Sequence, residues 1–355
     1  MSEPTNSTGL DAEKAARAAG LRYALDDRPG VTRKRRGKGW SYYDPRGRLI
    51  RDAGERERLN RLAIPPAWTD VWVSPWPDSH LLATGRDSEG RKQYRYHPDW
   101  RAIRDEAKYA RLIPFGRSLP RIRARVDEHL RLDALPREKV LAAVVQLLEL
   151  SLIRVGNSEY ARSNDSYGLT TLRDRHVEIV GPRIRFEFRG KGGKLHAVDV
   201  RDRRLARIVR QCRDVPGYEL FQYYGEDGDK RAVDSGEVND YLREISGEEF
   251  TAKDFRTWAG TLHAAAALLE CEPCADEREG RVRINESAEV VAERLGNTAA
   301  ICKACYIHPV VFERYLDGTL AELLDVPVAA DGEEMDGLRE EELALLAFLE
   351  RVDGA

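Results

Sequence analysis

The chain has 355 residues, of which 58 are Lys or Arg and 61 are Asp or Glu, and its formal net charge is -3 at pH 7. Hydrophobic residues make up 42% and charged residues 34%, which excludes a disordered chain and indicates two globular domains with buried cores. No apolar stretch approaches the roughly 20 residues that span a bilayer, so the composition also excludes an integral helical membrane protein.

The first part of the chain is predicted to be a short lead followed by a β-rich domain. Residues 1–18 begin MSEPTNSTGLDAEK and lack a secretory signal, so we expect a disordered lead on a cytoplasmic protein with reduced cysteines. Residues 19–105 contain short alternating runs such as GWSYYD, WTDVWVSP and SHLLATG, separated by turn signals. This pattern is typical of short strands and predicts a small β domain.

The rest of the chain is predicted to be mostly helical. Residues 106–326 contain apolar residues at helical spacing, as in REKVLAAVVQLLELSLIRVG, interrupted by a β-hairpin signal in RIRFEFRGKGGKLHAVDV (183–200). Residues 327–355 are predicted to be an acidic linker followed by a C-terminal helix. The sequence therefore predicts an α+β fold, with a small β-rich N-terminal domain and a mostly helical domain that carries a small sheet.

Charge is unevenly distributed along the chain. The segment 331–355 carries a net charge of -7, which leaves +4 on the remainder. Basic residues cluster with aromatic residues in RPGVTRKRRGKGW (28–40) and GRKQYRYH (90–97), and a further basic cluster is RSLPRIRAR (117–125). Such clusters are typical of a polyanion-binding surface, although each alone also fits a solvated charged face.

Three basic residues have local surroundings that suit phosphate chemistry. Arg154 follows a long apolar helix and precedes a glycine-containing helix stop, where a rigid guanidinium can bind a phosphate. Lys191 lies in the glycine-rich hairpin tip and can serve as a general acid. Arg256 lies near the start of a helix capped by Thr251, where the helix dipole favours an anion. Each residue alone also fits a structural or solubilising role.

Asn297 and Tyr306 follow the helix that Gly296 ends. A tyrosine phenol has a pKa near 10, so it attacks phosphorus only where fixed cations stabilise the developing charge. The two arginines, the lysine and the amide meet that requirement. With 14 tyrosines in the chain, an ordinary position at the edge of the core is the alternative for Tyr306.

Two cysteine pairs have the spacing of a zinc site. They are CEPC (271–274) and CKAC (302–305). The second pair lies within a helical pattern, where cysteine commonly packs as a small buried hydrophobe. We therefore expect no metal and no cofactor.

In combination, these segments resemble the poxvirus-type and bacterial type IB DNA topoisomerases. The similarity runs in family order from about residue 19 to 309 through AGLRYALDD, IPPAW, ATGRDSEGRKQYRYH, FGRSLPRIR, IRVGNSEYARSNDSYGLTTL, FRGKGGK, KDFRTWAGT and LGNTAAICKACYIHP. It implies a monomeric, nucleoid-associated bacterial enzyme that relaxes supercoiled duplex DNA by single-strand cleavage, swivelling and religation. Neither ATP nor metal would be needed, and residues 19–105 would be a DNA-clamp domain.

The resemblance also implies a role for each candidate catalytic residue. Tyr306 corresponds to the nucleophile that forms a 3′-phosphotyrosyl bond, and Lys191 to the general acid that protonates the leaving 5′ oxygen. Arg154 and Arg256 correspond to the arginines that bind the scissile phosphate. Asn297 stands where the poxvirus enzymes have histidine, so an amide would donate the hydrogen bond to a non-bridging oxygen.

The same resemblance assigns Gln93, Tyr94 and Tyr96 to DNA contact in the major groove, and the adjacent Arg91 and Lys92 are predicted to bind DNA beside them. A glutamine amide can hydrogen-bond an adenine edge at two positions, which would give base discrimination.

Two other classes of protein share part of this pattern. Tyrosine recombinases use the same Arg-Lys-Arg-Tyr chemistry, but they typically place a histidine three residues before the second arginine, where this chain has Lys253. A passive DNA-binding protein would explain the basic clusters, yet it would not explain four catalytic motifs in order. The acidic C-terminal segment is interpreted as autoinhibitory or partner-docking, since like charge near DNA is unfavourable.

Overall fold

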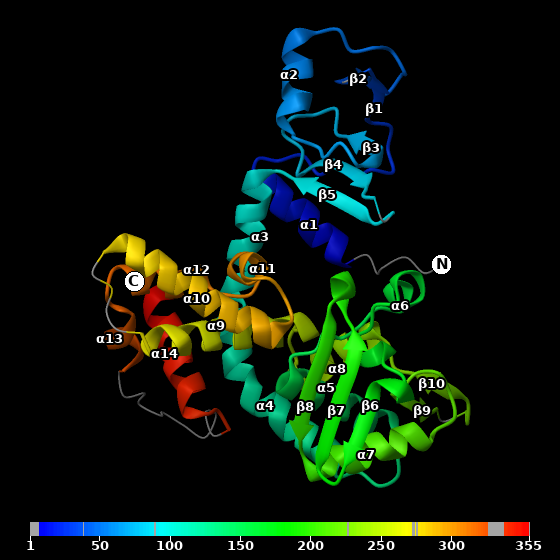
Figure 1. Cartoon of the computed structure of the whole chain (residues 1–355), viewed down its shortest axis with the longest axis vertical. Helices are drawn as coiled ribbons and strands as arrows, with labels where there is room; N and C mark the ends of the chain where they lie inside the picture. Colours follow the sequence, from blue (N-terminus) through cyan, green and yellow to red (C-terminus); the bar gives the residue numbers. More distant parts are fainter. Residues whose placement is uncertain are drawn as a thin grey trace. The chain divides into compact units, whose positions relative to one another are not determined.

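The computed structural model describes residues 7–37, 39–88, 90–225, 227–271, 274, 276–325 and 337–354. The chain divides into two compact units, Met1–Tyr109 and Ala110–Ala355. A sheet with a few helices forms the first, and helices dominate the second (Figure 1), which confirms the predicted α+β class. Within the described ranges, no helix is long and apolar enough to cross a membrane.

The first unit contains a five-stranded antiparallel sheet with strand order β2-β1-β3-β4-β5 (Figure 1). Its elements are α1 (Ser7–Ala18), β1 (Val31–Arg36), β2 (Gly39–Tyr43), α2 (Ala53–Arg61), β3 (Thr69–Val73), β4 (Leu81–Arg86), β5 (Lys92–Tyr96) and α3 (Pro98–Ala110). Alternate residues of the sheet, including Val31, Val73 and Ala83, form a core with Leu59 of α2. Strand β5 lies at the edge of the sheet, so one side of its backbone has no neighbouring strand within this unit as described.

The expectation that residues 1–18 are disordered is wrong for residues 7–18, which form α1. Ala16 of this helix is fully buried and clusters with Leu21 and Trp100. Burial of these apolar residues stabilises the helix. The polar residues around them are why the sequence pattern did not predict it. Residues 1–6 lie outside the described residues.

The second unit is built around α5, whose side chains are buried along most of its length. Its helices are α4 (Leu112–Leu130), α5 (Arg137–Ser151), α6 (Ser158–Asn164), α7 (Arg203–Asp214), α8 (Ser235–Ser246), α9 (Ala252–Leu269), α10 (Glu277–Leu295), α11 (Ala299–Cys305), α12 (Pro309–Leu316), α13 (Leu320–Leu324) and α14 (Glu340–Asp353). Its strands are β6 (Val177–Val180), β7 (Arg183–Arg189), β8 (Leu195–Arg201), β9 (Gln222–Tyr224) and β10 (Lys230–Ala232). Helix α5 packs against α4, α7, α8, α9 and β8, because its sequence is apolar on every side.

The predicted hairpin is confirmed. Strands β7 and β8 pair antiparallel from Arg183 opposite Arg201 to Arg189 opposite Leu195, and β6 extends the sheet (Figure 1). A short 3-10 turn, Lys191–Gly193, joins the two strands. Ile184, Phe186 and Phe188 are buried while the residues between them are more exposed, so the alternation in the sequence sets which face of the hairpin meets the core.

The acidic C-terminal helix belongs to the second unit. Glu342 of α14 is fully buried, and its carboxylate accepts hydrogen bonds from Arg123 of α4 at 2.8 Å and from Arg339 at 2.7 Å. Burial would raise the pKa of Glu342, but hydrogen bonds from these two guanidiniums outweigh it and lower the pKa to about 2. Helix α14 therefore anchors the end of the chain on α4, and its acidic residues are not all free to face a partner.

Replacing Glu342 with alanine should lower the free energy of unfolding by about 3 kcal/mol, since half-buried Arg123 keeps only Glu149 of its two carboxylate partners and Arg339 loses its bond to Glu342. The folded-state pKa is depressed, so this stabilisation is complete above the ordinary value of 4.5 and is lost as the pH falls toward 2. Urea unfolding at pH 7 and pH 3 measures both effects. The exposed neighbour Glu341, replaced in the same way, is the control; equal losses in the two variants would contradict this interpretation.

Candidate active site

Arg154 lies in a loop that leaves the end of α5. The helix ends at Leu152 with a left-handed backbone (φ 54°), which turns the chain sharply. The carbonyl of Arg154 accepts a hydrogen bond from the Leu169 amide at 2.9 Å, and that of Val155 from the Thr170 amide at 2.7 Å. These bonds fix the loop backbone, so the Arg154 side chain extends from a rigid base.

Arg256 is 4% exposed in the second turn of α9. The helix begins after Thr251, as predicted, and the Asp254 carboxylate accepts from the backbone amide of Thr251 at 2.7 Å. The Arg256 guanidinium donates to the carbonyls of Leu152 and Leu295, the latter at 2.8 Å. One cation thereby ties the end of α5 to the end of α10.

Asn297 follows α10, which ends at Gly296 in the left-handed region (φ 60°) as predicted. Its backbone amide donates to Ala292 at 2.9 Å. Its side-chain oxygen accepts a hydrogen bond from Arg154. The Nδ2 group is buried and has no hydrogen-bond partner within the described chain, so the Asn297 amide has a donor available for a bound anion.

Tyr306 ends the short helix α11, and its half-buried ring lies against Arg256. The guanidinium carbon of Arg256 is 5.1 Å from the ring centre. Helix α9 approaches closely at Gly260, where a side chain would come 2.4 Å from the Tyr306 carbonyl oxygen. Burial raises the pKa of the phenol, but the charge and hydrogen bond of Arg256, with Arg154 and Lys253, lower it below its ordinary value.

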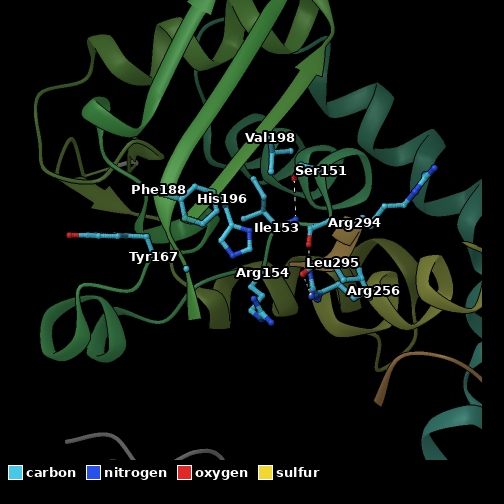
Figure 2. Close-up of a pocket in the computed structure, with 12 residues that line it drawn as sticks. Ser151, Ile153, Arg154, Tyr167, Phe188, His196, Val198, Arg256, Arg294 and Leu295 are labelled. Atoms are coloured by element: carbon cyan, nitrogen blue, oxygen red, sulfur yellow. Dashed lines mark hydrogen bonds between the residues drawn. The ribbon is translucent and has the colours of Figure 1, made fainter. Parts of the chain in front are cut away.

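The four candidate residues described above lie close together and carry two guanidinium groups. Arg154, Arg256, Asn297 and Tyr306 come from four separate segments and lie together in the second unit. Neither arginine pairs with a carboxylate anywhere in the described ranges. Figure 2 shows Arg154 and Arg256 among the side chains that line one pocket. Two buried or half-buried guanidiniums without a counter-ion favour a phosphate between them.

Lys191 is not part of this cluster. It is exposed at the hairpin tip, and its ammonium has no hydrogen bond or ion pair with any residue that the structure describes. The hairpin instead contributes Lys194, whose ammonium donates to the Asn297 carbonyl at 3.3 Å, and His196, which lines the pocket. Sequence reasoning missed both residues; the alternation of LHAVDV, which turns His196 to the same face as Val198, was the available signal.

Within the described ranges, the two cysteine pairs do not join a larger set of potential metal ligands. The described residues contain no group of three or more His, Cys, Asp or Glu side chains placed to hold a metal ion. Cys302 is fully buried and packs with Leu295 and Ile307. It fills the core beneath Tyr306, which agrees with cysteine as a small hydrophobe.

The five predicted DNA-contacting residues lie on or just before β5, one of the two edge strands of the sheet in the first unit. Tyr94 is 45% exposed and stacks on Tyr96, with ring centres 5.9 Å apart. Successive residues of a strand alternate between faces, so Gln93 lies on the opposite face of the sheet from these tyrosines. The edge therefore displays aromatic rings on one face and an amide on the other.

The polar residues of this edge are held by carboxylates. The ammonium of Lys92 is 2.7 Å from the Asp26 carboxylate. One oxygen of Asp87 accepts from Arg91 Nε at 2.8 Å and from Gln93 Nε2 at 2.9 Å. The side chains are thus oriented within the unit itself, and the edge carries less net positive charge than its sequence suggests.

Known proteins resemble this chain over most of its length. Residues 97–322 match the family model described as eukaryotic DNA topoisomerase I, catalytic core, and residues 39–87 match bacterial DNA topoisomerase IB, N-terminal domain. DNA topoisomerase 1B of Acanthamoeba polyphaga mimivirus is 32% identical over 293 residues, 81% of this chain and 87% of the viral protein. DNA topoisomerase 1B of Vaccinia virus (strain Copenhagen) is 24% identical over 281 residues, 76% of this chain and 84% of the relative.

Proposed function

This chain belongs to the type IB DNA topoisomerase family of isomerases, and from that premise we propose that it relaxes duplex DNA by two transesterifications at Tyr306. The observation that carries the proposal is the phenol beside two arginines without carboxylate partners among the described residues. A phosphodiester carries the negative charge that this cluster lacks. We extend the proposal to a monomer that acts on DNA at the nucleoid of a bacterial cell.

In the cleavage step, the Tyr306 oxygen attacks the scissile phosphorus and the bond from phosphorus to the 5′ oxygen breaks. The phenol proton passes to water, and Lys191 supplies a proton to the leaving 5′ oxygen. Arg154, Arg256 and the free Nδ2 donor of Asn297 stabilise the charge that develops on the non-bridging oxygens. The products are a 3′-phosphotyrosine and a 5′-hydroxyl.

The lowered pKa of Tyr306 assists this attack. A cation that stabilises the phenolate of the free protein also stabilises the partial phenolate in the transition state. Between cleavage and religation the 5′ end swivels and releases torsional strain. Attack of the 5′-hydroxyl on the phosphotyrosine then reverses every bond change. Since one phosphodiester replaces another, no ATP is consumed, and the arginines supply the charge neutralisation that a metal would otherwise give.

The test of this function uses the wild-type protein in EDTA without ATP. Relaxation of both positively and negatively supercoiled plasmid should persist under these conditions. Denaturation during the reaction should trap protein on the 3′ end of the broken strand, and mass spectrometry should place the nucleotide on the peptide that contains Tyr306. Loss of relaxation in EDTA, attachment to a 5′ end, or attachment to another tyrosine would each contradict the proposal.

We also propose that side chains of β5 contact base edges in the major groove and that Asp87 orients the side-chain amide of Gln93. Gln93 donates one of its two Nε2 hydrogens to the Asp87 carboxylate. Its amide oxygen and its second Nε2 hydrogen are then available to hydrogen-bond an adenine edge. Asp87→Ala should therefore reduce base discrimination by about 1–3 kcal/mol. It should also raise non-specific DNA affinity at low salt, because a negative charge beside Arg91 is removed.

Equilibrium binding to matched and single-base-changed duplexes at several salt concentrations measures both effects of the Asp87 substitution. Gln93→Ala is the control, since it should reduce discrimination without strengthening non-specific binding. If Asp87→Ala distinguishes matched from single-base-changed duplexes as well as wild type does, Asp87 does not orient Gln93 for base recognition.

A further inference from the structure

His196 of β8 joins the hairpin to the end of α10. Its ring stacks on Phe188, with ring centres 5.1 Å apart and planes within 6°. On Gly190, at the base of the hairpin turn, a side chain would come 2.5 Å from His196 Nε2. On Gly296, next to Asn297, one would come 2.0 Å from His196 Cε1. The imidazole therefore fills the space between these two glycines, and no larger residue at either position fits without a shift.

The surroundings of His196 are cationic. Arg154 from the loop after α5, Arg256 from α9, and Lys194 from the hairpin act on the ring, and Arg294 of α10 lines the same pocket. Burial and then the charges of Arg154, Lys194 and Arg256 lower the pKa of His196. No carboxylate lines this pocket in the part of the chain that the structure describes. The neutral imidazole is thus the form that the free protein holds at neutral pH.

His196 is also placed to act on the hairpin tip. Figure 2 shows its ring between Phe188 and Arg154, inside the pocket that contains Arg256. Its Nε2 atom is buried and makes no hydrogen bond to any described residue. Gly190, where an added side chain would collide with that atom, directly precedes Lys191. A ring held between Gly190 and Gly296 therefore lies where it can fix the base of the hairpin tip that carries Lys191.

We propose that His196 is a positioning residue that docks the hairpin on the end of α10, so that Lys191 can deliver its proton to the leaving 5′ oxygen. The inference rests on the proposed function of Lys191. Because Lys191 is exposed and its ammonium has no hydrogen bond or ion pair with a described residue, its placement depends on the hairpin that carries it. His196 itself transfers no proton in this scheme and forms no bond to the substrate.

The test separates proton delivery from the other parts of catalysis. A DNA strand with sulfur in place of the bridging 5′ oxygen has a leaving group that departs as a thiolate and needs little protonation. With the all-oxygen strand, His196→Ala should slow single-turnover cleavage by up to about 100-fold, as expected for a displaced catalytic group. With the sulfur strand, His196→Ala and Lys191→Ala should both cleave at near the wild-type rate. The double variant should be no slower than Lys191→Ala alone on the all-oxygen strand.

Val198→Ala is the matched control, because Val198 lies on the same face of β8 and lines the same pocket without touching either glycine. It should affect both strands equally, and thermal unfolding verifies that each variant is folded. If sulfur rescues Lys191→Ala but not His196→Ala, the positioning role of His196 is refuted while the proposed function stands. If sulfur rescues neither, Lys191 is not the proton donor, and the inference fails together with that premise.

Discussion

Replacing Tyr306 with phenylalanine should slow DNA cleavage by at least about 10⁴-fold and eliminate the covalent adduct, because the substitution removes only the attacking oxygen. The ring that packs beside Arg256 is retained, so the fold and the arginine pair should be preserved. DNA affinity should therefore change little. Plasmid relaxation, adduct trapping and equilibrium DNA binding on the same preparation measure the three quantities.

Tyr315 provides the matched control for the Tyr306 substitution. Its hydroxyl is buried and has no hydrogen-bond partner in the described ranges, so Tyr315→Phe removes the same atom at little structural cost. This variant should relax DNA at the wild-type rate. Relaxation by Tyr306→Phe, or equal losses in the two variants, would assign the nucleophile to another residue.

Arg256→Ala should reduce the single-turnover cleavage rate by about 10²–10³-fold or more, the loss typical of one fixed group that stabilises transition-state charge. The same substitution removes the largest favourable charge on the Tyr306 phenolate. The pKa of Tyr306 should consequently rise, and the alkaline limb of the rate-against-pH profile should move to higher pH. Cleavage measured across a pH series tests the rate and the shift together.

The comparison variant for Arg256 is Arg294→Ala. Arg294 lines the same pocket but is not among the groups that mainly set the pKa of Tyr306. The Arg294→Ala variant should therefore show the same dependence of cleavage rate on pH as wild type. Because Arg256 also binds two backbone carbonyls, its removal should reduce stability, and rates must be taken well below the thermal midpoint. If the cleavage rate of Arg256→Ala depends on pH in the same way as that of wild type, Arg256 does not lower the pKa of the attacking phenol.

Local signals predicted much of the fold. The alternation on both sides of a glycine-rich centre located the hairpin of β7 and β8, Thr251 marked the start of α9, and Gly296 marked the end of α10. The hairpin and the two helix boundaries are determined by residues close together in the chain, so they can be predicted from a single sequence. The lead was misjudged because α1 depends on burial of Ala16 against Trp100, more than 80 residues away.

The active site was less accessible to sequence reasoning. Nothing local indicates that Arg154 binds Asn297 or that Arg256 lies beside Tyr306; the family resemblance alone brought these residues together. The hydrogen bond from Arg91 to Asp87 was also not predicted, because a cluster of basic residues in the sequence does not show which carboxylates bind them. Lys191 remains a prediction, because its ammonium makes no contact with any described residue.

The two carbonyl contacts of Arg256 couple the lowered pKa of Tyr306 to the packing of the second unit. The guanidinium that lowers the pKa of the phenol is held in place by backbone from the ends of α5 and α10. It therefore reaches Tyr306 only after those helices have packed. If Tyr306 is the nucleophile as proposed, we expect a molecule in which those helices are unpacked to lack the charge that lowers the phenol pKa, and so to leave DNA strands uncut.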